Sequence, residues 1–202
     1  GLWDRLLVKH LVTVLAISLL LPALPASSAA EGPKAKAKSK TSKKLRKAAK
    51  LLRKEGQAFA KKSNYQAALV AYDRALQTYE AYPMVYNEVG VIHFLQGDLV
   101  KASASFRRAI ELYPALSVAW ANLAEVDRKR KRYVDSATHY KEFVSRRPKV
   151  ADGFYGLALA LMAQDNKAGA LWAMKRFVAL EKRADPQKIA EVQARVLRLE
   201  QE

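Results

Sequence analysis

The fold is decided by residues Pro83 to Leu116, which read PMVYNEVGVIHFLQGDLVKASASFRRAIELYPAL. Apolar side chains recur at helical spacing on both sides of Gly97-Asp98, a pair of residues that favours a turn. Pro114 stands near the end of the stretch, where it would stop the second helix. The stretch therefore predicts two helices joined by a tight turn.

The same pattern recurs along the chain with a period of 34 residues. Small residues are needed where paired helices cross closely, and large apolar residues fill the spaces between the crossings. Both kinds keep one register, which predicts a repeat protein and not an irregular helical bundle. The columns are Gly56, Gly90, Ala124 and Ala158; Ala68, Ala102, Ser136 and Ala170; Tyr72, Phe106, Tyr140 and Met174; and Leu52, Tyr86, Trp120 and Phe154.

This register divides residues 48–184 into repeats and leaves one segment after them. The repeats span 49–82, 83–116, 117–150 and 151–184. Residues 185–202 begin with Asp185-Pro186, an N-cap followed by a first-turn proline, and continue with a single apolar stripe. We expect a capping helix there, because the last repeat of an array needs its apolar face covered.

In these columns the chain resembles the tetratricopeptide-repeat (TPR) family. Besides the small residue of the first column, the family pattern appears in the turn-adjacent aromatics Tyr65 and Tyr133 and in the closing prolines Pro114 and Pro148. The resemblance implies an all-α protein, a right-handed α-solenoid of about four helix-turn-helix units with the C-terminal helix as a cap.

The third and fourth repeats depart from the first two at one position. Phe143 and Phe177 stand where the earlier repeats have Ala75 and Ala109. Because a phenylalanine ring needs far more room than a methyl group, we expect the helices to pack differently there.

The resemblance also implies a protein-binding role. TPR arrays bind peptides or partner helices along a concave face lined by the first helix of each unit, so we expect an interaction scaffold or adaptor. Glu88 and Val118 depart from the pattern of the family members that clamp a terminal carboxylate. The alternative for part of the groove set is simple burial between repeats. The carried-over groove residues are Arg53, Gln57, Asn87, Val91, Phe94, Asn122, Glu125, Arg128, Tyr155, Leu159 and Met162.

Residues 1–30 have the order of a bacterial secretory signal peptide. Arg5, Lys9 and His10 precede an uncharged apolar run, residues 11–21, and prolines and small residues follow as far as Ala30. We expect cleavage and a periplasmic or secreted location. The alternative is a membrane anchor formed by residues 11–30, since the lysines that follow favour the cytoplasmic side.

Residues 31–47 form a basic low-complexity segment. Residues 31–54 carry eleven basic residues and one acidic residue, a net +10 of the chain's +17. We expect a mobile, extended tether that contacts an anionic membrane, an acidic envelope polymer or an acidic protein, or that is only a solvated spacer. Nucleic acid is the weaker option, because no aromatic residues stand among the lysines to stack bases.

A second hypothesis makes this segment the main binding element of a membrane-surface or nucleic-acid-associated protein. The tether residues are Lys34, Lys36, Lys38, Lys40, Lys43 and Lys44.

The sequence contains no motif of a known catalytic site. The absence of cysteine excludes disulfides, thiolate metal sites and cysteine nucleophiles. His93 and His139 fall on predicted helices and have no partner at metal or triad spacing, and there is no glycine-rich phosphate loop or nucleophile elbow. We expect no enzymatic activity, no metal and no cofactor.

Overall fold

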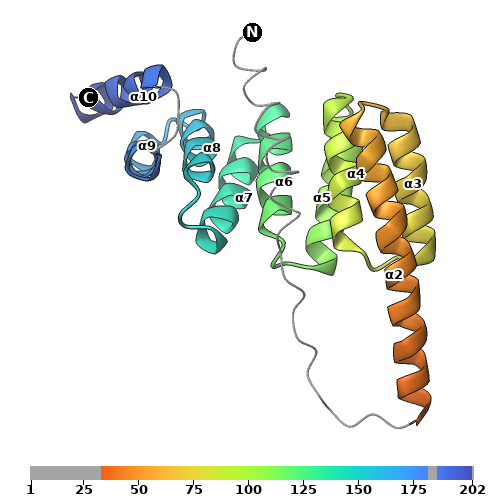
Figure 1. The fold of residues 1–202 in the computed structure, drawn as a ribbon. Helices are drawn as coiled ribbons and strands as arrows, with labels where there is room; N and C mark the ends of the chain where they lie inside the picture. Colours follow the sequence, from red (N-terminus) through yellow and green to blue (C-terminus); the bar gives the residue numbers. More distant parts are fainter. Residues whose placement is uncertain (1–32, 182–185, 202) are drawn as a thin grey trace. The chain divides into compact units, whose positions relative to one another are not determined.

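The structure is a computed structural model that describes residues 33–181 and 186–201 (Figure 1). All of the secondary structure in these two ranges is helical, which confirms the predicted all-α class. Residues 1–30, interpreted above as a signal peptide or anchor, and Asp185 lie outside the described residues. Among the described helices, none has both the length and the apolarity needed to cross a membrane.

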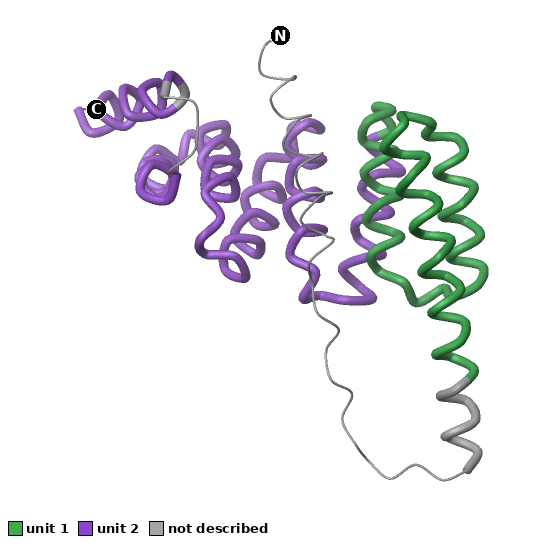
Figure 2. Tube along the Cα trace, viewed as in Figure 1, with its two compact units in different colours: residues 1–98 green, residues 99–202 purple. Residues whose placement is uncertain are grey.

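The chain divides into two compact units, residues 1–98 and 99–202 (Figure 2). The helices of unit 1 are α2 (Pro33–Lys61), α3 (Tyr65–Thr78) and α4 (Pro83–Leu95). Those of unit 2 are α5 (Leu99–Leu112), α6 (Ser117–Lys129), α7 (Tyr133–Arg146), α8 (Ala151–Met162), α9 (Lys167–Leu180) and α10 (Pro186–Gln201).

The core of unit 1 lies between the C-terminal half of α2, helix α3 and helix α4. Ala68, Tyr72 and Ala75 of α3 are completely buried there. A Cβ atom added to Gly56 of α2 would collide with the ring of Tyr72. The small and large columns of the first repeat therefore meet as the register predicts.

The N-terminal part of α2 corrects the expected extended tether. The backbone is helical from Pro33 onward and continues without a break into the first helix of repeat 1. Lysine and alanine are both good helix formers, and proline is tolerated at the first helical position. Residues 41–48 are exposed, because this part of α2 overhangs α3 (Figure 1). The low-complexity segment from Pro33 to Lys47 is therefore helical and not extended.

The core of unit 2 is built by helix pairs α6–α7 and α8–α9. Its buried side chains come from the predicted columns, among them Ala124, Tyr140, Ala158 and Met174. Helix α10 packs on α9 and contributes Val192, whose side chain is also buried.

The two phenylalanines of the later repeats are accommodated in different ways. Gly153 leaves room for the ring of Phe143, because a Cβ at that position would collide with it. Phe177 is completely buried, and its ring centroid lies 5.2 Å from that of Tyr155. The packing differs from that of the alanine-containing first repeat, as expected, and Gly153 is the compensating residue that makes this packing fit.

The turns inside the repeats share a backbone feature that also has the 34-residue period. Ser63, Gly97, Lys131 and Asp165 all have positive φ angles, of 58°, 81°, 60° and 56°. Only glycine adopts this left-handed conformation without steric cost. The sequence indicates this turn at Gly97. The other three positive φ angles were not predicted, because those repeats have Ser63, Lys131 and Asp165 in place of glycine.

Replacing Lys131 by glycine is expected to raise the free energy of unfolding by about 0.5 to 1 kcal/mol, since it removes the cost of a positive φ in a residue with a side chain. Denaturant unfolding measures the change. The neighbouring Arg130→Gly is the matched control, because Arg130 has a φ of −81°. That control should lose stability, and the account of the turn is wrong if the two variants lose it equally.

Candidate functional site

A buried ion pair occupies the position of the first two predicted groove residues in unit 1. Arg53 of α2 donates from Nε and Nη2 to Glu88 Oε1 of α4, at 2.9 and 2.6 Å. Gln57 Nε2 donates to the same oxygen at 2.7 Å. The Glu88 side chain is only 2% exposed, and that of Arg53 11%.

The charges of this pair depend on each other. Burial raises the pKa of the Glu88 carboxyl, and the hydrogen bonds and charge of Arg53 oppose that shift. Burial alone would lower the pKa of Arg53, but the hydrogen bonds and charge of Glu88 raise it overall. Two residues predicted to bind a partner thus hold a carboxylate of their own chain. Glu88 departs from the carboxylate-clamp pattern in the sequence, but its pairing with Arg53, one repeat and one residue earlier, was not predicted.

The predicted α4 residues differ in their exposure. Asn87 is 4% and Val91 2% exposed, so both are buried. Phe94 is partly exposed. In this helix Phe94 therefore has the most accessible side chain of the predicted set.

A second ion pair lies on α6 in unit 2. Arg128 donates from Nε and Nη2 to the two carboxylate oxygens of Glu125, at 2.8 and 2.7 Å. The Tyr140 hydroxyl donates to Glu125 from α7 at 3.2 Å. Burial raises the pKa of Tyr140, and the charge of Glu125 raises it further. Asn122, one turn earlier on α6, is buried. The guanidinium of Arg128 is thus held in one orientation by its own helix.

Helix α8, which contacts α6, carries partly exposed apolar side chains of the predicted set. They are Tyr155, Leu159 and Met162. Burial raises the pKa of Tyr155, and the negative charge of Glu191 on α10 raises it further. The positive charges of Arg128 and Arg195 lower it. Tyr155 therefore lies among charges from both neighbouring helices. We call the predicted residues of α6 and α8 the first-helix face of unit 2; they are Asn122, Glu125, Arg128, Tyr155, Leu159 and Met162.

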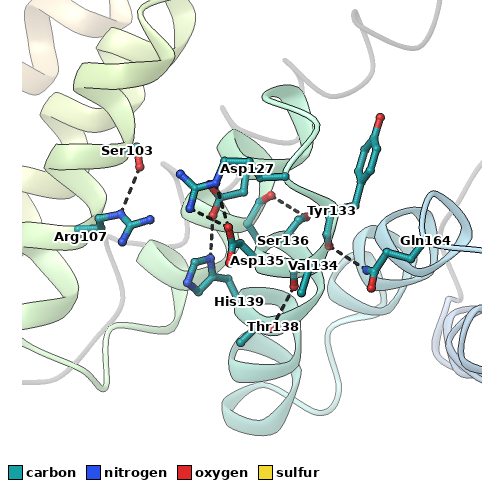
Figure 3. A network of polar contacts seen from close by, with 12 residues as sticks. Ser103, Arg107, Asp127, Tyr133, Val134, Asp135, Ser136, Thr138, His139 and Gln164 are labelled. Atoms are coloured by element: carbon teal, nitrogen blue, oxygen red, sulfur yellow. Dashed lines mark hydrogen bonds and ion pairs between the residues drawn. The ribbon is translucent and has the colours of Figure 1, made fainter. Parts of the chain in front are cut away.

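A polar network between α6 and α7 was not anticipated (Figure 3). His139 Nδ1 lies 2.9 Å from Oδ2 of Asp127, whose side chain is completely buried. Arg132 Nε lies 3.5 Å from the other carboxylate oxygen of Asp127. The sequence shows no partner for His139 at metal or triad spacing, and the partner in the structure lies twelve residues earlier, across the α6–α7 turn.

The side-chain hydrogen bonds of this network connect α6 to α7 and have a structural role. The Ser136 hydroxyl, one turn before His139, donates to the carbonyl oxygen of Ala124 at 2.8 Å. Within residues 33–181 and 186–201, no group of three His, Cys, Asp or Glu residues is placed to hold a metal ion. The Asp127–His139 pair thus joins α6 to α7.

An apolar hollow of about 280 Å³ in unit 2 is lined by residues of α7, α8 and α9 and of the turn between α8 and α9. Trp172, 52% exposed, forms part of its wall. None of its lining residues belongs to the predicted groove set. The full lining is Lys141, Val144, Leu157, Leu161, Asn166, Gly169 and Trp172.

Comparison with known proteins gives one family match. The family described as "Tetratricopeptide repeat" matches residues 53–117 and 121–188, which together make up about two thirds of the chain. No curated protein matches the sequence.

Several solved structures are similar. "MamA 41-end from Desulfovibrio magneticus RS-1" is 22% identical with a TM-score of 0.64, and the match covers 76% of this chain and 95% of that one. "Crystal structure of MamA protein" is 19% identical with a TM-score of 0.62, covering 70% and 79%. "Crystal structure of APC/C hetero-tetramer Cut9-Hcn1" is 19% identical with a TM-score of 0.63, covering 72% of this chain and 29% of that one. At these identities the likeness concerns the fold.

Proposed function

Because the chain belongs to the tetratricopeptide-repeat (TPR) family, we propose that it is an interaction scaffold that binds a partner protein along the first-helix face of unit 2. Repeat arrays of this kind act by presenting an extended surface, a role that needs no reaction chemistry. The partner segment is an extended peptide or an amphipathic helix.

The observation that carries the proposal is the combination of apolar and charged groups on this face. Tyr155, Leu159 and Met162 are partly exposed, and Tyr155 and Met162 also pack against the core of unit 2. Apolar anchors surrounded by oriented polar groups are typical of the parts of an interface that contribute most to affinity. Because Glu125 already holds Arg128 in place, binding costs little side-chain entropy at the guanidinium.

The positions of charged and apolar side chains on this face also limit the chemistry of the partner segment. Arg128 keeps a 22% exposed side chain, while its partner Glu125 is only 7% exposed, so the accessible charge is positive. The partner segment therefore presents apolar side chains to α8 and an acidic or polar group toward α6. The proposed location is the bacterial periplasm or cell envelope, which rests on the signal-like order of residues 1–30.

Truncating Leu159 or Met162 to alanine is expected to weaken capture of the partner from the native cell by about tenfold or more. The matched control is Val134→Ala, an apolar residue of α7 that is 67% exposed. All three variants should keep the helical circular dichroism of the parent and remain folded at the temperature of the assay. Undiminished capture by both face variants, or equal loss in the control, would show that the partner binds elsewhere.

A further inference from the structure

Helix α2 presents a row of lysines that the proposed function does not use. Lys43, Lys47, Lys50 and Lys54 follow each other at intervals of four, three and four residues. This spacing places side chains on one face of an α-helix, one turn apart. At a rise of 1.5 Å per residue, the row is roughly 16 Å long. All four side chains are exposed.

The row lies on the side of α2 that faces away from the core. Ala49 and Gly56 of the same helix are buried and point toward α3. On a helix with 3.6 residues per turn, these positions lie roughly 140° around the axis from the lysine row. In the sequence the same spacing continues toward the N-terminus at Lys40 and Lys36, both within the helical range.

Helix α2 has almost no negative charge that could neutralise the lysine row. The sequence of α2 contains a single acidic residue, Glu55. Its carboxylate lies 3.6 Å from Nη1 of Arg74 on α3. The one negative charge of the helix is therefore directed toward another cation.

We propose that this face of α2 lies flat against an anionic phospholipid surface. A straight row of cations on a helix that overhangs its unit can approach a plane along its whole length (Figure 1). Each lysine near such a surface is attracted independently, so the binding adds up without any need for precise geometry. This inference does not depend on the first-helix face of unit 2.

Three observations favour lipid over nucleic acid or an acidic protein. The row contains lysine only, and lysine acts as a point charge, whereas arginine is preferred where phosphate or carboxylate is held in a defined geometry. Leu51, 63% exposed, stands beside the row on the helix surface. An exposed leucine next to lysines suits shallow insertion among lipid headgroups. No aromatic residue stands between Lys43 and Lys54 to stack on bases.

The test measures binding of the full chain to vesicles of phosphatidylcholine with and without phosphatidylglycerol, at low and high salt. The difference between the two vesicles isolates the electrostatic contribution from any apolar contribution of residues 1–30. Replacing Lys43, Lys47, Lys50 and Lys54 by glutamine is expected to reduce binding to the anionic vesicles roughly 600-fold, because each lysine contributes a factor of roughly five and the four factors multiply. Leu51→Gln should reduce it about threefold or more.

The matched control replaces four exposed basic residues outside the row, Lys62, Arg130, Lys141 and Lys149, and so removes the same charge. It should lose no more than about threefold, since long-range attraction is weakened by salt. Melting curves verify that each variant is folded. Equal losses in the row and control variants would overturn the proposal. So would a row variant that loses binding to a DNA duplex but retains its binding to anionic vesicles.

Discussion

Replacing Arg53 by alanine is expected to lower the free energy of unfolding by about 3 to 5 kcal/mol, because Glu88 is then left buried without its cationic partner. The carboxylate is 2% exposed and receives hydrogen bonds from Arg53 and Gln57. Gln57 alone cannot compensate the charge. Denaturant unfolding followed by helical circular dichroism measures the change, provided that the slope with denaturant stays constant.

Two control variants separate this explanation from a general loss of packing. Lys54→Ala changes the adjacent exposed residue and should alter stability by no more than about 0.5 kcal/mol. The double variant Arg53→Met with Glu88→Leu removes both charges and should recover most of the loss, because apolar pairs of similar volume replace buried ion pairs well. If the double variant is as unstable as Arg53→Ala, the unpaired carboxylate is not the cause.

Replacing Gly56 by leucine is expected to cost about 3 kcal/mol or more, because even a Cβ at this position collides with the ring of Tyr72. Tyr72 is completely buried, so its ring cannot move aside into solvent. The helix propensity of leucine would favour the variant by about 1 kcal/mol and only partly offsets the collision. A thermal or denaturant melt measures the net effect.

The matched control is Ala58→Leu, which places the same side chain at an exposed position two residues later in α2. It should be neutral within about 0.5 kcal/mol. A Gly56→Leu variant with the stability of the parent would mean that α2 and α3 do not cross at this residue. The 34-residue register would then have been assigned wrongly in the first repeat.

The sequence predicted the packing of the repeats because packing depends on residue size at regular intervals. Gly56 against Tyr72 follows directly from the register, as does the burial of Ala68. The prediction of an extended tether at the start of α2 was wrong for a physical reason. Lysine and alanine both favour a helix, and the low complexity of the segment does not cancel this preference. Lys131 was missed because its positive φ comes from the tertiary turn and not from its own preference.

The polar groups of the candidate site were less predictable. Family resemblance identified Arg53 and Gln57 as groove positions, but it could not show that Glu88 would take up their donors. The Asp127–His139 pair was missed for a related reason, since two helices of one hairpin bring residues twelve apart together without any motif. Pairing between side chains depends on rotamers, and the repeat pattern specifies only the backbone positions.

Site-specific photo-crosslinking in the native cell tests the scaffold function most directly. A photoreactive phenylalanine analogue replaces Leu159 on the first-helix face of unit 2, and in separate variants it replaces Val134 on α7 or Trp172 at the apolar hollow. The account predicts that irradiation links a partner protein to the Leu159 variant, and that Val134 and Trp172 give little or none of this product. A product formed at Val134 or Trp172 but not at Leu159 would contradict it.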